Sequence, residues 1–272
     1  MPELPEVETT RRGLEPHLLG QRIESVIVRN RALRWPVPRD FTRLASGCSV
    51  QGLGRRGKYL LIDCARGWII VHLGMSGSLQ IVPGSAPAGK HDHVDLLLGS
   101  GKAVRLTDPR RFGAVLWARE DPLRHPLLAR LGPEPLSDAF NATWCHARTR
   151  GRSAAIKNIV MNSHFVTGVG NIYASEALFR AGIHPGLAAG RLSFARCEKL
   201  VAAIRQTLLD AIAAGGSSLR DYVGAEGHPG YFQQRYFVYG REGEICRLCG
   251  AAIKSLRQGQ RSTFFCSTCQ RR

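Results

Sequence analysis

The chain has 272 residues, a formal net charge of +17 and a pI of about 10.3. This length supplies two domains of ordinary size, and such an excess of Lys and Arg predicts a polyanionic partner. A membrane-spanning protein is excluded, because no stretch approaches the roughly 18 apolar residues that a span needs. A basic membrane-surface protein is disfavoured, because the sequence has no long amphipathic basic helix and no lipidation motif.

The N-terminus is acidic, with Glu3, Glu6 and Glu8, and it lacks an apolar run. A signal peptide is therefore not predicted, and we expect a cytoplasmic protein with reduced thiols. Four cysteines are then expected to be ordinary packing residues. They are Cys48, Cys64, Cys145 and Cys197.

The first half of the sequence predicts one helix and a series of short strands. The helix is expected over residues 7–19. Apolar runs and alternating patterns, separated by turn residues, predict an antiparallel β-sandwich. The expected strands are 22–29, 59–63, 68–72, 94–98, 102–107 and 114–118.

The second half changes to a helical period. Helices are expected over 154–162 and 173–181, and a third runs from an N-cap at Ser193 to about residue 214. Prolines 133 and 135 indicate a linker, and residues 224–230, with three glycines and a proline, indicate a mobile loop. We therefore predict a catalytic domain at 1–132, a linker at 133–152, a helical domain at 153–235 and a finger at 236–272.

The end of the chain carries Cys246, Cys249, Cys266 and Cys269 in the pattern C-x2-C-x16-C-x2-C. This spacing predicts four thiolates around one zinc ion, with 257–260 as the hairpin turn. The alternatives are a disulfide pair or a purely structural clip. Residues 241–272 hold seven Lys/Arg and two Asp/Glu, a charge of 7 − 2 = +5. A basic zinc finger of this kind favours nucleic acid as the partner.

The first residues suggest chemistry of a different kind. If Met1 is removed, Pro2 begins the chain with a secondary amine. A free α-amine has a pKa of about 8, so it is a usable nucleophile towards a sugar aldehyde carbon. Glu3 and Glu6 lie close enough to donate or accept protons. On these residues alone, a segment that merely caps the first helix is the favoured interpretation.

Several motifs together resemble one known family. They are the N-terminal Pro-Glu-Leu-Pro-Glu-Val-Glu-Thr, Gly-Lys-Tyr-Leu at 57–60, His-Leu-Gly-Met-Ser-Gly at 72–77, Thr-Asp-Pro-Arg-Arg-Phe-Gly at 107–113, Gly-Val-Gly-Asn-Ile-Tyr-Ala-Ser-Glu at 168–176 and the four-cysteine tail. In this order, across nearly the whole chain, they are similar to the formamidopyrimidine-DNA glycosylase family. The resemblance implies an α+β fold, with an N-terminal antiparallel β-sandwich and flanking helices, a helical helix–two-turn–helix domain and a zinc-bound β-hairpin finger.

The resemblance also implies a bifunctional DNA repair enzyme. Such an enzyme removes 8-oxoguanine and formamidopyrimidines paired with cytosine, then cuts the abasic strand by β,δ-elimination. Pro2 resembles the Schiff-base nucleophile and Glu3 the general acid/base. Lys58 resembles the group that assists base loss, and Arg261 the finger arginine associated with δ-elimination. Glu6 matches a supporting carboxylate.

The base must leave the duplex before it can react, and side chains must fill the space it leaves. Met75, Arg110 and Phe112 match the filling residues, and their turn-rich surroundings predict exposed loop tips rather than core. Other positions match the family's DNA contacts or lie near them. They are His72, His91, Arg152, Lys157 and Asn171. The expected partner is damaged double-stranded DNA, bound by a monomer that carries one structural Zn²⁺ and associates with a bacterial nucleoid.

Three other interpretations remain open at this stage. An endonuclease VIII-like glycosylase for oxidised pyrimidines shares the Pro-Glu start, the lysine and the finger. A non-catalytic DNA-damage sensor would not need Pro2, Glu3 and Lys58. A zinc-ribbon module of transcription or the ribosome would explain the charge and the cysteines, but not the N-terminal motif.

Overall fold

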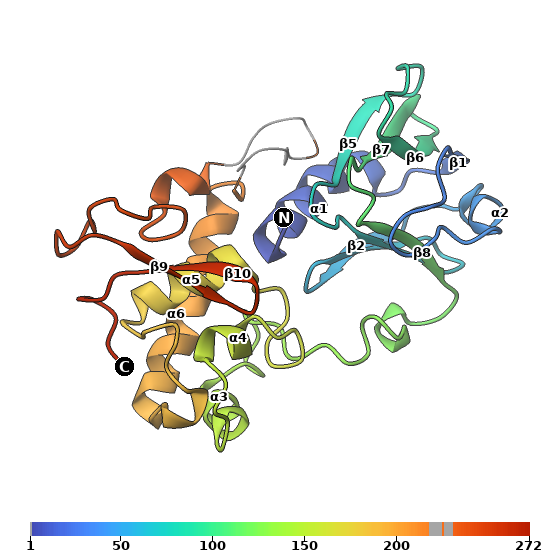
Figure 1. Cartoon of the computed structure of the whole chain (residues 1–272). Coiled ribbons are helices and arrows are strands. Elements are labelled where there is room, and N and C mark those ends of the chain that lie inside the picture. The colour runs from blue at the N-terminus through green and yellow to red at the C-terminus, as the bar shows by residue number, and fades with distance from the viewer. Residues whose placement is uncertain (1, 218–224, 226–230) are drawn as a thin grey trace. The chain divides into compact units, whose positions relative to one another are not determined.

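The structure, a computed structural model, describes residues 2–217, 225 and 231–272. Of the loop expected at 224–230, all but Ala225 lies outside the described residues. The chain divides into two compact units (Figure 1). Unit 1 consists of Met1–Ala129 and Ile212–Gln233, and unit 2 of Arg130–Ala211 and Gln234–Arg272.

Unit 1 contains two four-stranded antiparallel sheets. The first has the order β1 (Ile23–Val28), β6 (Asp92–Leu98), β7 (Lys102–Thr107), β5 (Ser78–Pro83). The second has the order β2 (Gly52–Arg56), β3 (Tyr59–Asp63), β4 (Trp68–His72), β8 (Ala114–Ala118). The helical elements that lie wholly within the described part of this unit are α1 (Leu4–Leu18), α2 (Phe41–Ala45) and the 3₁₀ turn η1 (Pro122–Arg124).

The two sheets share one hydrophobic core, which makes them a sandwich. Val94 and Val104 of the first sheet belong to the same buried cluster as Ile62 and Ile69 of the second. Helix α1 adds Leu14 and other apolar side chains to that cluster. The predicted β-sandwich is thus confirmed, and α1 is fixed to it along its buried face.

Four predicted strands match β3, β4, β7 and β8 residue for residue. Two strands, β2 and β5, were missed, and both lie at a sheet edge. Strand β2 reads Gly-Leu-Gly-Arg-Arg and all five residues are only half-buried, so it lacks the apolar alternation that marks a strand. Strand β5 ends in Pro83, which an edge position tolerates.

Unit 2 is helical, with one hairpin. Its helices are α3 (Ala142–Thr149), α4 (Ile156–Val160), α5 (Asn171–Arg180) and α6 (Phe194–Ala213), whose last two residues fall in unit 1; its hairpin strands are β9 (Lys254–Gln258) and β10 (Arg261–Phe265). Two 3₁₀ turns, η2 (Ala189–Arg191) and η3 (Phe232–Arg235), complete the element order. Helix α3 lies within the segment predicted as a linker, and it begins where the Asn141 side chain accepts a hydrogen bond from the Trp144 amide. The hairpin strands leave Gly259 and Gln260 as the turn, inside the predicted 257–260.

The cysteines outside the finger are buried and free, as predicted for packing residues. Among the described residues, no helix combines the length and the apolar character needed to cross a membrane.

A buried carboxylate ties α5 to the segment that leads into the finger. Glu176 is 3% exposed, and its two oxygens accept hydrogen bonds from the backbone amides of Phe237, Val238 and Tyr239 at 2.8, 3.0 and 2.8 Å. These three amides have no strand partner, so the carboxylate takes the place of secondary structure.

We expect Glu176→Ala to lower the free energy of unfolding of the zinc-loaded protein by about 3 kcal/mol or more, because three buried amides lose their hydrogen-bond acceptor. Urea denaturation measures the change. The control is Glu198→Ala, an exposed position on α6, which we expect to stay within about 0.5 kcal/mol of the parent. Equal losses in the two variants would contradict the assigned role of Glu176.

Candidate active site and DNA interface

The N-terminal residues form a tightly bonded cap. Glu3 is the N-cap of α1 and is 1% exposed. Its amide donates to Glu6 Oε2 at 2.8 Å, and its side chain accepts from the amide of Glu6, which makes a capping box. Glu6 Oε1 accepts from the Ser217 amide at 2.8 Å. The capping interpretation and the catalytic one are therefore compatible, since the cap fixes buried Pro2 beside two buried carboxylates.

Lys58 lies in the two-residue turn between β2 and β3. Gly57 before it has a φ of +57°, a conformation that glycine adopts without strain. The turn is buried at Gly57 and half-buried at Lys58. The lysine is thus held on a short connection between two strands of the core sheet rather than on a long mobile loop.

His72 belongs to the same neighbourhood as Lys58. It is paired with Tyr59 across β3 and β4, and the two ring centroids are 4.8 Å apart. Burial lowers the pKa of His72 to about 4, assisted by the positive charges of Lys58 and Arg34. The imidazole is therefore neutral at physiological pH. Its Nδ1 accepts a hydrogen bond from the Gly74 amide at 3.0 Å, which leaves the proton on Nε2 as a donor.

The predicted space-filling residues lie on two loops that are fastened together. Met75 is 39% exposed and Phe112 is 38% exposed, as expected for loop tips, and the Arg110 guanidinium stacks 4.8 Å from the centre of the Phe112 ring. Between the loops lies Asp108, which is fully buried. Its Oδ1 accepts from Ser76 Oγ at 3.1 Å and its Oδ2 from the Gly113 amide at 2.8 Å.

Two further features border these loops. The His91 carbonyl accepts from the Asp108 amide at 2.9 Å, so the turn before β6 is attached to the same carboxylate-bearing residue. A hollow of about 470 Å³ lies beside Arg110 and Phe112. Its lining is Ala32, Leu33, Arg34, Arg110, Arg111 and Phe112. Apolar walls with three guanidinium groups suit a planar polar group or an anion.

In unit 2, three other predicted residues, Lys157, Asn171 and Arg261, lie in one neighbourhood, and Lys157 is buried there. Lys157 is 1% exposed, and its ammonium donates to Thr263 Oγ1 at 2.7 Å and to the Ser262 carbonyl at 3.2 Å. Asn171, the first residue of α5, donates to the same carbonyl at 3.2 Å. Arg261 is exposed and directly precedes Ser262. Lys157 and Asn171 thus hold the strand that presents Arg261, and a DNA contact by either remains a prediction.

Arg152 lies apart from that group. It is exposed, and its carbonyl accepts from the Gly190 amide at 2.8 Å. No carboxylate pairs with its side chain in the part of the chain that the structure describes. An exposed, unpaired guanidinium suits a phosphate contact, and this role also remains a prediction.

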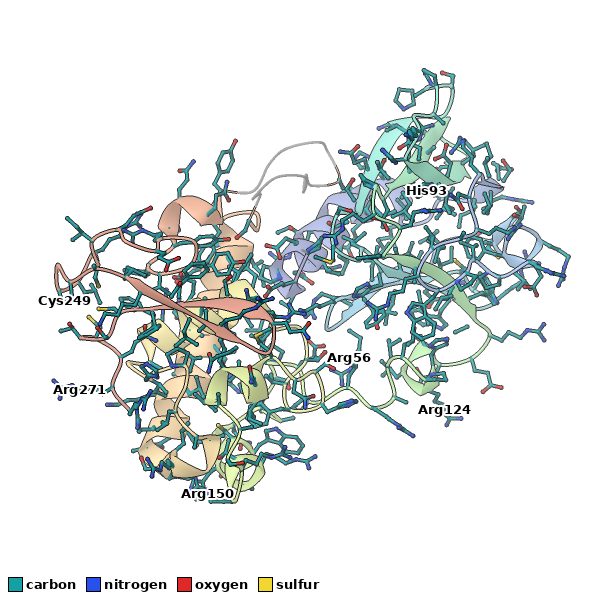
Figure 2. The ribbon with its side chains drawn as sticks, viewed as in Figure 1. Arg56, His93, Arg124, Arg150, Cys249 and Arg271 are labelled. Atoms are coloured by element: carbon teal, nitrogen blue, oxygen red, sulfur yellow. The ribbon has the colours of Figure 1, made fainter. Side chains whose placement is uncertain are left out.

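The four finger cysteines form a site for one zinc ion. Their sulfur atoms all lie within 4.8 Å of one another, with Cys246–Cys269 at 3.9 Å and Cys249–Cys266 at 3.4 Å. Tetrahedral Zn–S bonds of about 2.3 Å require sulfur separations of about 3.8 Å, so the donor set fits zinc. None of the four forms a disulfide. Figure 2 labels Cys249 at the end of the hairpin away from its turn.

Three family models match consecutive parts of the chain. The formamidopyrimidine-DNA glycosylase N-terminal domain matches residues 1–115, the formamidopyrimidine-DNA glycosylase H2TH domain matches 131–223, and the zinc finger found in FPG and IleRS matches 243–272. The formamidopyrimidine-DNA glycosylase of Stutzerimonas stutzeri is 58% identical over 271 residues, which is 100% of both chains. The one from Thioalkalivibrio sulfidiphilus is also 58% identical over 100% of both chains. The chain belongs to the formamidopyrimidine-DNA glycosylase family.

Solved structures of this family agree with the fold. The MutM (Fpg) protein of Thermus thermophilus is 40% identical and superposes with a TM-score of 0.89, over 99% of this chain and 98% of that one. A Lactococcus lactis Fpg mutant in complex with DNA containing Fapy-dG is 34% identical, with a TM-score of 0.93 over 100% of both chains. The predicted fold class, including the helix–two-turn–helix domain and the finger, is therefore confirmed.

Some residues of the site were not singled out from the sequence. Asp108 lies inside a recognised motif, but only the structure shows that it joins two loops. Arg34 comes from a segment without a motif, and only folding brings it towards His72. Glu8 and Arg11 carried a visible signal, because charges spaced three and four residues apart share one helix face.

Loss of the zinc ion should weaken DNA binding by the finger. We expect Cys249→Ser, or chelation of the parent protein, to remove the zinc and to weaken binding of a duplex with a tetrahydrofuran abasic analogue by at least about tenfold, because the hairpin loses its folding energy. Metal analysis and fluorescence anisotropy measure the two effects. Excision lost while binding remains intact would mean that the metal acts in the chemistry instead.

The low pKa of His72 should make the stability of the protein depend on pH. Because its pKa in the folded protein lies below the ordinary value of 6.5, protonation favours the unfolded chain, and stability falls as pH drops from about 6.5 towards about 4. His72→Gln keeps hydrogen-bonding groups but does not titrate. We expect this variant to lose less free energy of unfolding than the parent between about pH 6.5 and 5. Identical losses in urea titrations at the two pH values would contradict the low pKa.

Proposed function

We propose that this protein excises oxidised purines, namely 8-oxoguanine and formamidopyrimidines, from duplex DNA and then cuts the abasic strand. The observation that carries the proposal is the start of the chain, where Pro2 precedes Glu3 and a capping box formed with Glu6. Membership of the family, together with the Fapy-dG-containing DNA held by the Lactococcus lactis relative, supports purine lesions as the substrate. An association with the nucleoid through DNA follows from the same proposal.

The chemistry begins at the α-amine of Pro2, after removal of Met1. Its nitrogen attacks sugar C1′ while the damaged base leaves and takes up a proton, and the product is an iminium with the opened sugar. Glu3 is placed by its cap role next to Pro2, where it protonates the ring oxygen as the sugar opens. Lys58 assists departure of the base, and Glu6 holds the backbone of Glu3 in place.

The iminium then serves as an electron sink for strand cleavage. It acidifies the C2′ proton, so loss of that proton expels the 3′ phosphate, and a second elimination expels the 5′ phosphate. By resemblance, Arg261 of the finger attends the second elimination. Zinc bound by four protein thiolates has no free coordination position, so it supports the finger and takes no part in these steps.

We expect borohydride to trap a covalent adduct between the protein and a duplex with 8-oxoguanine opposite cytosine. Reduction converts the iminium into a stable amine, so peptide mapping should place the DNA on the N-terminal peptide. A duplex carrying thymine glycol is the comparison. Stronger trapping on thymine glycol would shift the assignment to the endonuclease VIII-like activity.

Two results would reject the proposal in different ways. No adduct with either duplex would remove the enzymatic function altogether. An adduct mapped to a lysine-containing peptide remote from the N-terminus would keep the enzyme but exclude Pro2 as its nucleophile. Lys58→Met serves as the companion variant, since it should still be trapped by a preformed abasic site while base excision slows.

A further inference from the structure

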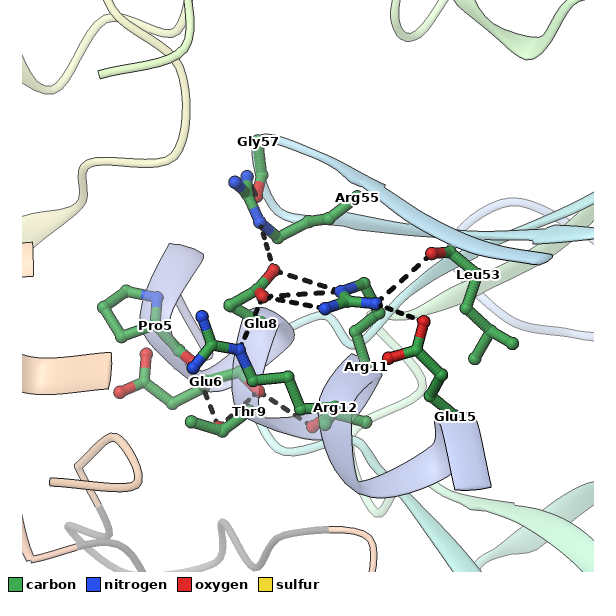
Figure 3. A network of polar contacts seen from close by, with 11 residues as sticks. Pro5, Glu6, Glu8, Thr9, Arg11, Arg12, Glu15, Leu53, Arg55 and Gly57 are labelled. Atoms are coloured by element: carbon green, nitrogen blue, oxygen red, sulfur yellow. Dashed lines mark hydrogen bonds and ion pairs between the residues drawn. The ribbon is translucent and has the colours of Figure 1, made fainter. Parts of the chain in front are cut away.

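The carboxylate of Glu8 is the centre of a cationic cluster on α1 (Figure 3). Its Oε1 accepts from Arg12 Nε at 2.8 Å and from Arg11 Nη2 at 3.1 Å, both on the same helix. Its Oε2 accepts from Arg55 Nε at 3.1 Å, which comes from β2. One carboxylate therefore joins the helix that begins at the N-terminal cap to an edge strand of the core sheet.

Arg55 makes a second bond that extends the connection. While its Nε binds Glu8, its Nη1 donates to the Gly57 carbonyl at 3.0 Å. Gly57 is the residue before Lys58, and its carbonyl belongs to the peptide group that joins the two. A planar guanidinium holds both acceptors at once with fixed geometry, which an ammonium group cannot do.

We propose that Arg55, held by Glu8, is a positioning residue that fixes the Lys58 turn relative to α1 and hence to Pro2 and Glu3. The inference rests on the proposed function, because it concerns where the lysine of that reaction lies. The order of contacts is Glu8 of α1, then Arg55 of β2, then the carbonyl that precedes Lys58.

A purely structural role fits the contacts less well. Helix α1 is already attached to β2 through Arg11, which donates to the Leu53 carbonyl at 3.4 Å and pairs with Glu15 at 2.9 Å. The bond from Arg55 to the Gly57 carbonyl adds nothing to that attachment, since it joins β2 to the turn that follows β2 and not to α1. The bond instead fixes the orientation of the peptide group between Gly57 and Lys58.

The contact between Glu8 and Arg55 is shielded from solvent, whereas Arg12, another partner of Glu8, is exposed. The side chains of Glu8 and Arg55 are each 12% exposed, whereas that of Arg12 is 59% exposed. A shielded charged pair persists only when its hydrogen bonds are nearly all satisfied. Burial raises the pKa of Glu8, but the hydrogen bonds from Arg11 and Arg12 outweigh it and hold the pKa below its usual value. The Glu8 carboxylate is therefore charged at neutral pH.

The test compares four variants in single-turnover excision from an 8-oxoguanine·cytosine duplex with saturating enzyme. We expect Arg55→Gln to slow excision about 10- to 100-fold, the loss typical of a catalytic group displaced by about 1 Å. Arg55→Lys keeps the charge but cannot bind both acceptors, so we expect it to remain at least about fivefold slow. Glu8→Gln should slow excision, and combining it with Arg55→Gln should add little, because the two act as one unit.

The matched control is Arg12→Gln. It removes a 2.8 Å partner of the same carboxylate, but one without a contact to the turn, and we expect its excision rate within about twofold of the parent. For every variant, affinity for a duplex with a tetrahydrofuran abasic analogue should stay within about threefold, which separates kcat from KM effects. Full activity of Arg55→Lys, or Arg55→Gln as fast as Arg12→Gln, would overturn the proposal.

Hydrogen exchange gives a second readout that does not depend on activity. Amide exchange of a peptide covering the β2–β3 turn should accelerate in Arg55→Gln and Glu8→Gln, and should stay unchanged in Arg12→Gln. Unchanged exchange in all three would overturn the positioning role even if rates fell. If the parent protein itself excises no base, the proposed function fails, and the exchange data still decide whether Arg55 orders the turn.

Discussion

The structure depends on an ordered start of helix α1, where Pro2 and Glu3 are buried. A chain terminus is normally the least ordered part of a domain, because few contacts oppose its conformational entropy. Here the proposed nucleophile, Pro2, is expected to become such a terminus when Met1 is removed. Glu6 resolves the conflict with two bonds, one to the amide of Glu3 and one to the amide of Ser217. Gly216 permits this approach, since a Cβ there would lie 3.0 Å from Glu6 Oε1. The first turn of α1 is thereby bonded to a segment more than 200 residues away.

The first two acidic residues of helix α1, Glu6 and Glu8, have different tasks. Residues two apart lie on opposite sides of a helix, so Glu6 and Glu8 cannot serve the same partner. Glu6 faces backbone amides and closes the cap, while Glu8 faces guanidinium groups and reaches β2.

The sequence predicted features that depend on local pattern. The core strands β3, β4, β7 and β8 have apolar runs long enough to define both ends, and the cysteine spacing defines the zinc site without any knowledge of the fold. Features set by long-range partners were not predictable. Strand β2 has no apolar alternation and forms only because β3 pairs with it. The burial of Lys157 depends on residues more than 100 positions later, whereas the sequence suggested a lysine facing DNA.

Three of the segments expected to meet DNA are each fixed by a buried ionisable side chain that is bonded to backbone. Glu6 fixes the N-terminus, Glu176 fixes the entry to the finger, and Lys157 fixes β10 near Arg261. Buried charges are costly unless hydrogen-bonded, and that cost makes the arrangement specific, because any displaced backbone leaves the charge unsatisfied. Zinc holds the open end of the hairpin, while Lys157 and Asn171 hold β10 beside the turn. The finger therefore needs both the metal and α4 to present Arg261 in one orientation.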